Sequence, residues 1–322
     1  MPIITDRKKA LETIEGVRDR KAVLAVFCTA SHWNTEAILL ACQNYMRKHN
    51  LESIPVSVGI TFNYEHMPQA QRVTWCGDPK AGFLSILKHL EALCGTPKAP
   101  YADVTVLPHL DHAHPERDRW ALVDGLPWLA SVMFDAQTYP YARNVELTTD
   151  YVRSYGKLVL VEGACDALSV RGSKAREGAC ADRYVEMAHN YVSATCADFL
   201  VADLGTEQQS GGAGNCTYLQ ARAQALTAAL EKPMLVLHGT SCLTEDQMLS
   251  LAADGVIRVN MWTRIAREAG IHAADRLVGR LDGIRGGDFE SCDSHTYLND
   301  LTVKAAEIME GVLDVLGYDK LG

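Results

Sequence analysis

The feature that most constrains this chain is a recurring apolar run of strand length, separated from the next such run by longer amphipathic stretches. Runs rich in Val, Ile and Leu are typical of parallel strands that are buried on both faces. The eight expected strands are Ala22–Cys28, Ile54–Thr61, Asp103–Leu110, Ser131–Asp135, Lys157–Val161, Phe199–Leu204, Pro233–His238 and Val256–Met261. The expected helices between them include Thr35–His49, Gly82–Leu93, Asn144–Tyr155, Cys180–Cys196, Tyr218–Leu230 and Thr244–Asp254. Alternation of this count predicts an α/β fold, a (β/α)8 TIM barrel.

We expect the whole chain to form one domain. Its 322 residues, of which 48% are hydrophobic, are enough to bury the core of one large barrel. No linker, charge run or low-complexity segment divides the sequence. After the eighth strand, residues 286–300 read as an irregular stretch before a last helix, Leu301–Leu316. The expected domain therefore covers residues 1–322, with a helical tail over residues 286–322 that packs on the barrel or on a neighbouring subunit.

Charge and composition exclude several classes of protein. The formal net charge is −9, and no cluster of Lys and Arg is available to neutralise phosphates, so nucleic acid is not an expected partner. No apolar run approaches the roughly 20 residues that a membrane-spanning helix needs, so no membrane association is expected. The ten cysteines are scattered without a Cys-x-x-Cys pair, and several lie in apolar runs, which indicates a reducing cytoplasm.

Polar residues gather where the expected strands end. In a barrel, the carboxyl ends of all strands meet at one mouth, where catalysis is housed in this fold. The residues at these positions are Asp111, His112, Asp135, Glu162, Glu207, Gln208, His238, Ser241, Asn260 and Thr263. Two loops that follow expected strands, 169–180 and 210–215, are candidates for a lid or an active-site loop, with solvated surface loops as the alternative.

The segment from Leu107 to His114 places an acid among three imidazoles at the end of an apolar run. An Asp beside a His at a buried strand end can hold a divalent cation and a proton-transfer group side by side. His238 ends a second apolar run, and the small residues after it allow backbone N–H groups to approach an anion. The pattern therefore indicates a metal site shared by His112 and His238. The alternative is that these histidines are hydrogen-bonded core or surface groups, which is the simpler interpretation of His109 and His114.

Six motifs of this chain resemble the class II, metal-dependent fructose-bisphosphate and tagatose-bisphosphate aldolases. They are Leu110-Asp-His112, Ser131-Val-Met-Phe-Asp135, Val161-Glu162, Asp203-Leu-Gly-Thr206, Leu237-His-Gly-Thr-Ser-Cys242 and Val259-Asn-Met-Trp-Thr263. Their order and spacing match from about the first strand to the eighth, and the match is weak in the N-terminal third and in the tail. The resemblance implies a TIM-barrel lyase that uses a divalent metal to stabilise an enediolate. It also implies a small-molecule keto sugar or sugar phosphate as substrate, and we expect a homodimer or homotetramer.

The resemblance also implies a role for individual residues. Asp111 is similar to the proton-transferring acid of the family, and Glu162 is the surviving member of a carboxylate pair. His112 and His238 are similar to zinc ligands, and Asn260 to a side chain that contacts the substrate. The expected substrate-binding and phosphate-binding residues are Gly239, Thr240, Ser241, Trp262, Thr263 and Gln209.

The expected metal centre departs from the family pattern at two positions. Gln208 stands where the family has a third histidine, and Ala164 stands where it has a second carboxylate. A neutral amide oxygen is a poorer zinc ligand than an imidazole, so either Glu207 or Gln208 supplies a weaker ligand, or the preferred metal is a harder ion such as manganese or magnesium. Zinc remains the first expectation. Three further residues that could compensate if they fold toward the mouth are His32, His66 and Cys242.

The expected phosphate site departs as well. Cys242 replaces a glycine of the family, and Trp262 replaces an acidic residue. An indole adds an apolar wall and reduces the space, which favours a shorter or less charged substrate than fructose 1,6-bisphosphate. The alternative is that Trp262 packs between the barrel and its helices and leaves Ser241, Thr263 and backbone amides to hold one phosphate.

Three functions are consistent with these residues. The first is an aldolase-like lyase with a metal at His112 and His238. The second is a metal-independent isomerase, epimerase or other enzyme that uses Asp111 and Glu162 as an acid and base pair on the same barrel. The third is a non-catalytic sensor of sugar phosphates. The first is favoured because a binding protein has no need to keep these acids and imidazoles at the mouth.

Overall fold

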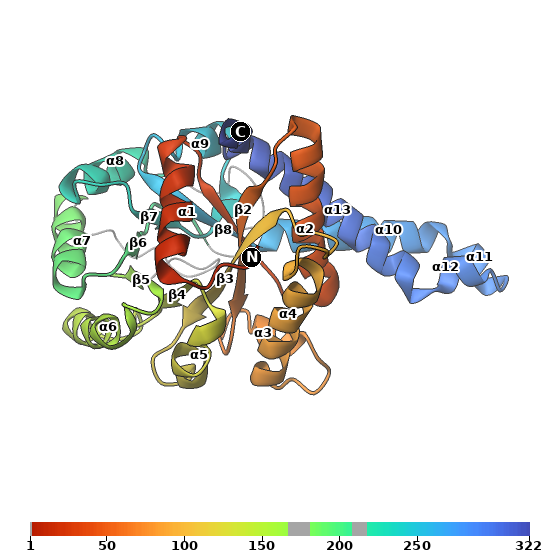
Figure 1. Cartoon of the computed structure of the whole chain (residues 1–322), viewed down its shortest axis with the longest axis horizontal. Coiled ribbons are helices and arrows are strands. Elements are labelled where there is room, and N and C mark those ends of the chain that lie inside the picture. Colours follow the sequence, from red (N-terminus) through yellow and green to blue (C-terminus); the bar gives the residue numbers. More distant parts are fainter. Residues whose placement is uncertain (1, 167–180, 208–217) are drawn as a thin grey trace.

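Eight parallel strands form a closed barrel, which confirms the predicted (β/α)8 fold (Figure 1). The computed structural model describes residues 2–166, 181–207 and 218–322. Each strand pairs with its neighbours in chain order, and β1 pairs with β8 to close the sheet. The strands are β1 Leu24–Cys28, β2 Ile54–Thr61, β3 Val104–Ala113, β4 Ser131–Phe134, β5 Leu160–Ala164, β6 Phe199–Val201, β7 Leu235–Leu237 and β8 Val256–Met261. No helix in the described part of the chain is long and apolar enough to cross a membrane.

Helices surround the barrel and extend beyond it. The α-helices are α1 Arg7–Asp19, α2 His32–His49, α3 Gln69–Arg72, α4 Pro79–Cys94, α5 Arg119–Val123, α6 Tyr141–Tyr155, α7 Ala181–Thr195, α8 Gln220–Ala229, α9 Glu245–Ser250, α10 Thr263–Gly279, α11 Leu281–Arg285, α12 Phe289–Cys292 and α13 Ser294–Val315. The 3-10 helices are η1 Leu126–Trp128, η2 Thr240–Cys242 and η3 Tyr318–Leu321.

Local sequence explains where several helices begin. The side chains of Asp6, Ser31 and Asp78 accept hydrogen bonds from backbone N–H groups in the first turns of α1, α2 and α4. Thr244 and Gln247 form a reciprocal capping box at the start of α9. Such caps satisfy N–H groups that have no partner within the helix, and each contributes about 1 kcal/mol.

Both ends of the chain pack against the strands of the barrel. Helix α1 contacts β1, β5 and β8, and an ion pair of 2.5 Å joins Arg7 to Asp198, just before β6. At the other terminus Tyr318 is fully buried. Its hydroxyl accepts a hydrogen bond from Ala25 N and donates one to Pro55 O, both at 2.9 Å. Both termini of the chain therefore pack at the N-terminal end of the barrel, opposite the carboxyl ends of the strands.

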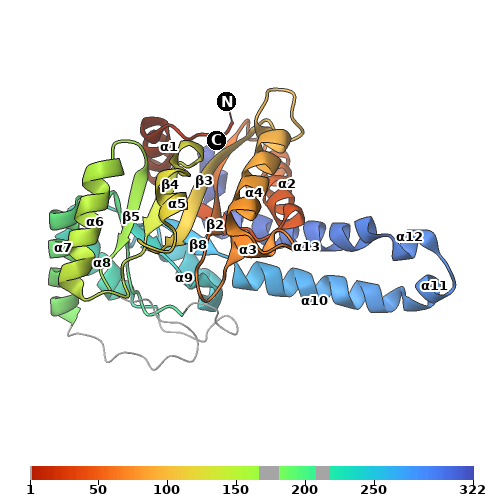
Figure 2. The same ribbon diagram turned by 90° about the horizontal axis from the view of Figure 1, so that it is seen from below.

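The region after β8 differs from the sequence-based expectation. Residues 286–300, expected to be irregular, contain α12 and the start of α13, and the unassigned segment before them forms α10 and α11. Helices α10 and α13 lie side by side and project away from the barrel (Figure 2). Helix α13 also contacts α2, which lies against the barrel.

A charged pair crosses the inside of the barrel. Arg258 on β8 and Glu162 on β5 are fully buried and form an ion pair. The guanidinium also donates to Ser57 Oγ at 3.1 Å and to Ser131 Oγ at 3.3 Å. Four strands are thus joined by one polar cluster, in a place where barrels of this type usually carry aliphatic side chains.

We predict that breaking this pair from one side is far more harmful than replacing both partners. Arg258→Met leaves a buried carboxylate without its counter-ion, and we expect the free energy of unfolding to fall by about 3–5 kcal/mol. The double variant Arg258→Met, Glu162→Leu should recover most of that loss, because no unpaired charge remains. Urea unfolding followed by circular dichroism measures both, with Arg153→Ala in the exposed Arg153–Asp150 pair as control. A double variant as unstable as the single variant would contradict this account.

Candidate metal and catalytic site

A small cavity of about 70 Å³ opens at the carboxyl ends of β1, β2, β3, β7 and β8. This is the mouth at which enzymes with this fold place their active sites. The residues that line it are Cys28, Thr61, Tyr64, Met67, Gln69, Asp111, His112, His238, Gly239, Thr240, Ser241, Asn260, Met261, Trp262 and Thr263. Nine of the twelve predicted site residues therefore line one cavity.

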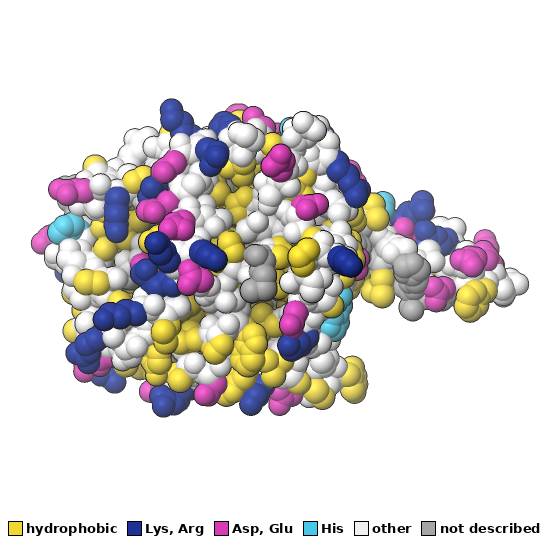
Figure 3. All heavy atoms as spheres, in the orientation of Figure 1, with side chains coloured by type: hydrophobic (Ala, Val, Ile, Leu, Met, Phe, Trp, Pro, Cys, Tyr) yellow, Lys and Arg dark blue, Asp and Glu magenta, His cyan; other side chains and the backbone are white. Residues whose placement is uncertain are grey.

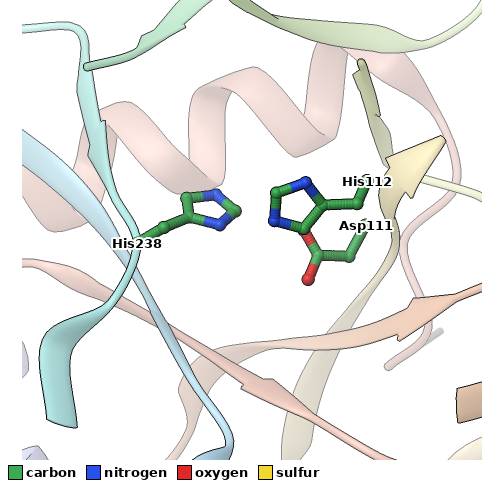
Figure 4. A group of neighbouring side chains, drawn as sticks. All are labelled: Asp111, His112 and His238. Atoms are coloured by element: carbon green, nitrogen blue, oxygen red, sulfur yellow. The ribbon is translucent and has the colours of Figure 1, made fainter. Parts of the chain in front are cut away.

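Three buried side chains at this mouth converge on one point. One ligand atom from each of Asp111, His112 and His238 lies within 4.8 Å of the others. The rings of His112 and His238 face each other across the site at a centroid distance of 4.9 Å, with Asp111 beside His112 (Figure 4). Two imidazoles and a carboxylate at such separations are a donor set for a divalent cation.

The backbone at His112 explains how two consecutive residues reach the same point. Side chains alternate between the two faces of a regular strand, so Asp111 and His112 should point apart. Instead, the pairing of β3 with β4 shifts register between Leu110 and Ala113, and His112 adopts a left-handed backbone conformation with φ of 47°. Irregularities of this kind redirect side chains next to active sites. The strain at His112 is therefore part of the construction of the site.

His112 is oriented from two sides. Its Nδ1 lies 2.7 Å from Asp135 Oδ2, and the side chain of Gln137 donates to the same oxygen at 2.9 Å. The ring of Tyr64 stacks on the imidazole, with centroids 4.1 Å apart and planes within 6°. A carboxylate behind a histidine fixes its tautomer and makes it a better metal ligand. Asp135 and Tyr64 therefore present the Nε2 atom of His112 to the site.

His238 is held by the turn that follows β7. Its carbonyl accepts a hydrogen bond from Thr206 Oγ1 at 2.6 Å. Gly239 has a φ of 71°, which a side chain would disfavour, and the next residue, Thr240, donates from Oγ1 to Asn260 O at 2.8 Å. The turn thus depends on glycine and is bonded to β8 and to the segment after β6.

Asp111 lies at the centre of a hydrogen-bonded group. The amide of Asn260 donates to its Oδ1 at 3.1 Å, and the thiol of Cys28 lies 3.6 Å from its Oδ2. His109 Nε2 is 3.8 Å from Asp111 Oδ1 and 3.7 Å from Glu162 Oε2. The carboxylate is therefore positioned by three different strands, and His109 connects it to the charged pair inside the barrel.

The protonation of the three central groups follows from burial and mutual charge. Burial acts to raise the pKa of Asp111, but the neighbouring imidazoles of His112 and His109 outweigh it and hold that pKa well below its usual range. For His112, burial acts to lower the pKa, but Asp111 and Asp135 raise it. Burial lowers the pKa of His238 to about 3, so its imidazole is neutral at physiological pH. Asp111 is an anion, and His238 keeps a free lone pair for a metal ion.

Two buried polar atoms of the site lack a hydrogen-bond partner and are suited to bind a cation and a substrate. Among the residues that the structure describes, His238 Nε2 and Asn260 Oδ1 are buried and have no hydrogen-bond partner. A buried polar atom without a partner is unfavourable by about 1–3 kcal/mol unless a ligand satisfies it. The two atoms therefore fit a site that binds a metal ion through imidazole nitrogen and a substrate through the amide oxygen.

The predicted residues fall into three groups. Asp111, His112, His238, Asn260, Gly239, Thr240, Ser241, Trp262 and Thr263 line the cavity. Gln208, Gln209 and the loop 169–180 lie outside the described residues. Glu207 is described but does not join the cluster of candidate ligands. Of the suggested substitutes, His32 bonds to Ser85 at 2.9 Å and His66 lies against the ring of Tyr64, and neither is in that cluster.

Glu162 is placed differently from the expectation. The sequence analysis ended the fifth strand at Val161, which puts Glu162 at the mouth. The observed β5 runs from Leu160 to Ala164, so Glu162 lies inside the strand, bonded to Arg258 in the interior of the barrel. It does not line the cavity.

Sequence analysis missed several residues that shape the site. Asp135 was recognised at a strand end but not as the partner of His112, and Tyr64, Met67, Gln69 and Cys28 were not considered. The only sequence signal was the strand-end position of Asp135. The others reach the cavity through the loop after β2 and the end of β1, which only the folded barrel brings to His112 and Asp111.

Comparisons with known proteins agree with the barrel fold. The family model described as class-II fructose-bisphosphate aldolase matches residues 13–320. The fructose-bisphosphate aldolase from Campylobacter jejuni has a similar structure, with a TM-score of 0.77 and 15% identity over 98% of this chain and 95% of that one. For a putative fructose-1,6-biphosphate aldolase from Coccidioides immitis the TM-score is 0.68 and the identity 18%, over 98% of this chain and 99% of that one. For the YdjI aldolase from Escherichia coli K12 the TM-score is 0.65 and the identity 15%, over 96% of each chain. No curated protein matches the sequence.

We predict that Asp135→Asn weakens metal binding without unfolding the protein. Removing the charge behind His112 should raise the dissociation constant for zinc about 10–100-fold. Competition with a chromophoric chelator measures this constant. Asp118→Asn is the matched control, since Asp118 is also buried but accepts from the backbone N–H groups of His114 and Asn63 outside the cluster. Equal zinc affinity of wild type and Asp135→Asn would show that Asp135 does not support a ligand.

Proposed function

This chain belongs to the class-II fructose-bisphosphate aldolase family, and from that premise we propose that it is a metal-dependent lyase that cleaves a carbon–carbon bond of a keto sugar or keto sugar phosphate. The observation that carries the proposal is the convergence of Asp111, His112 and His238 at the barrel mouth. Asn260, in hydrogen-bond contact with Asp111, completes the constellation. The family contributes the class of reaction, and the geometry contributes the residues.

His112 and His238 would hold the metal ion, which we propose is zinc. When bound, such an ion withdraws electron density from the substrate carbonyl and stabilises the negative charge that develops as the bond breaks. Imidazole nitrogen is a preferred zinc ligand. A further ligand from Gln208 would be a neutral amide oxygen, and this would move the preference toward manganese or magnesium.

Asp111 would act as the base that accepts the proton of the substrate hydroxyl. Cleavage requires a base to take the proton from the hydroxyl group on the carbon that becomes the aldehyde. Asp111 is ionised and buried, and Asn260 Nδ2 and Cys28 Sγ hold its two oxygens. A carboxylate held in place in this way can accept that proton and return it in the reverse direction. The orphaned Oδ1 of Asn260 would accept a hydrogen bond from a substrate hydroxyl.

The cavity wall favours a substrate with little charge. Tyr64, Met67, Met261 and Trp262 form an apolar side, and no Lys or Arg lines the cavity among residues 2–166, 181–207 and 218–322. One phosphate could be held by the turn from Gly239 to Ser241 and by the backbone N–H groups at the start of α10, because a helix N-terminus attracts anions. A second phosphate has no cationic partner in this part of the site.

The structure does not favour the metal-independent alternative, because Glu162, one member of its acid and base pair, lies outside the cavity. Isomerisation by an acid and base pair would need Glu162 beside Asp111 in the cavity, but Glu162 is bonded to Arg258 inside the barrel. The sensor alternative would not need an ionised Asp111 next to orphaned ligand atoms. The aldolase-like lyase is therefore the function that the geometry favours.

We predict that removal of divalent metal abolishes cleavage and that zinc restores it. The reaction is followed on keto sugars and their monophosphates by trapping the aldehyde product. Asp111→Asn separates the two roles in the same assay. It should keep one metal ion per chain while turnover falls roughly 10²–10⁴-fold, the usual contribution of general acid–base catalysis. Full turnover by protein that elemental analysis shows to be free of metal would refute the metal-dependent mechanism, and full turnover by Asp111→Asn would refute the proton-transfer role.

We also predict poor cleavage of fructose 1,6-bisphosphate. Its efficiency should lie well below about 10⁴ M⁻¹s⁻¹, the lower end of the ordinary enzyme range. Fructose 1-phosphate is the matched control, because it lacks only the second phosphate, and it should bind at least as tightly in competition experiments. An efficiency for the bisphosphate at or above that range would mean that Trp262 does not restrict the site.

A further inference from the structure

A second cavity lies at the end of the barrel opposite the mouth. Its volume is about 710 Å³, against about 70 Å³ for the cavity at the mouth. Its walls come from the start of α1, from α5 and η1 before β4, and from the end of α6 and the turn before β5. The residues that line it are Thr5, Asp6, Arg7, Lys8, Val123, Leu126, Pro127, Tyr155, Lys157 and Leu158. We call this cavity the basal pocket.

The charged side chains of the basal pocket are mostly cations. Arg7, Lys8 and Lys157 stand against one carboxylate, Asp6, which already accepts a hydrogen bond from the backbone N–H of Lys9 at 2.9 Å. Lys157 is exposed and forms no ion pair within the described part of the chain. The nearest carboxylate of Lys8 is 3.8 Å away, in an exposed contact with solvent around it. A chain with a net charge of −9 thus has a local positive site, which favours an anion.

Arg7 is anchored at the wall of the pocket. Its Nη2 donates to Asp198 Oδ1 at 2.5 Å, and the other carboxylate oxygen accepts from the backbone N–H of Val161 at 2.9 Å. Its Nε atom has no hydrogen-bond partner among residues 2–166, 181–207 and 218–322. A guanidinium has five N–H donors, so Arg7 keeps donors beyond the one used by Asp198. Guanidinium groups held in this way are well suited to bind phosphate oxygens.

The other side of the basal pocket is apolar. It consists of Val123, Leu126, Pro127, Leu158 and the ring of Tyr155. Leu158 is 62% exposed, so a large apolar side chain faces water beside a hollow. On this face of the molecule, basic side chains gather near the lower end of α1, and hydrophobic side chains lie below them, over α5 (Figure 3). An inorganic ion would leave the apolar wall uncovered, whereas a ligand with a flat apolar group would cover it.

We propose that the basal pocket binds a nucleoside phosphate, with its phosphate on Arg7, Lys8 and Lys157 and its base against Tyr155 and Leu158. A phosphate monoester has a charge of about −1.5 to −2 at pH 7, which matches several cations better than a single carboxylate does. A volume of about 710 Å³ lies within the range of about 300–1,000 Å³ that is usual for small-molecule sites. The nucleotide binds at the opposite end of the strands from Asp111, so it does not compete with a substrate at the mouth.

The test is isothermal titration calorimetry on the full, metal-loaded chain, with adenosine monophosphate as the probe. Adenosine and inorganic phosphate are titrated separately. We expect one nucleotide per chain, and we expect each of the two fragments to bind at least tenfold more weakly. Lys157→Glu should raise the dissociation constant of the nucleotide about tenfold or more, because it reverses a charge next to the phosphate. Lys98→Glu is the matched control, since Lys98 is also exposed but lies outside the pocket.

A second set of variants tests the apolar wall. Leu158→Ala should raise the dissociation constant about threefold, and Leu249→Ala should leave it unchanged, although both leucines are 62% exposed. Tyr155→Leu keeps the apolar volume but removes the ring, so it should weaken binding more than Tyr155→Phe does. Circular dichroism should show unchanged folding for the variants of Lys157, Leu158 and Leu249, because all three residues are at the surface.

Three outcomes would overturn the proposal. The first is no binding of adenosine monophosphate at millimolar concentration. The second is binding that Lys157→Glu and Leu158→Ala leave unchanged, since the nucleotide would then lie elsewhere on the protein. The third is inorganic phosphate that binds as tightly as the nucleotide, because the apolar wall would then contribute nothing. Equal weakening by Lys98→Glu and Lys157→Glu would show an effect of net charge alone and would also count against the pocket.

Discussion

Closure of the sheet by the pairing of β1 with β8 is the constraint on which the rest of this structure depends. The register sets Val26 beside Asn260, and the same circle of hydrogen bonds continues through β2 to Asp111 on β3. Residues more than 200 positions apart in the sequence thus meet at one mouth. Without closure, Asn260 would lie at the opposite edge of an open sheet, far from the carboxylate that it contacts. The chemistry of the site is therefore a property of the closed barrel rather than of any one segment.

The polar interior links the stability of the barrel to its site. Arg258, Glu162 and His109 are buried one after another between the centre of the barrel and Asp111. In a dry interior, a charge is tolerated only where other charges and hydrogen bonds compensate for lost hydration. Behind Asp111 there is consequently a group of buried polar side chains that do not line the cavity. A rigid support of this kind is what a site needs if a proton is to move over a fixed distance.

Some of these features could be predicted from the sequence and some could not. The eight strands and the mouth positions of Asp111, His112, His238 and Asn260 follow from patterns of apolar runs and their ends, which are local. Glu162 was misplaced because its position depends on Arg258, a partner 96 residues away that makes burial of the carboxylate tolerable. Helix α10 was missed because exposed apolar residues such as Ile271 and Val278 weaken the contrast between faces that marks a surface helix. The orientation of His112 by Asp135 and Tyr64 arises only after folding.

The left-handed backbone at His112 limits how this site can change during evolution. Among residues other than glycine, asparagine, aspartate and histidine are enriched in that conformation, which costs other side chains roughly 1–3 kcal/mol. Of these, histidine and aspartate are the good ligands for a divalent metal. A descendant of this protein could therefore exchange an imidazole for a carboxylate at position 112 with little change in the backbone. A cysteine or a glutamate at this position would add backbone strain that the rest of the site would have to offset.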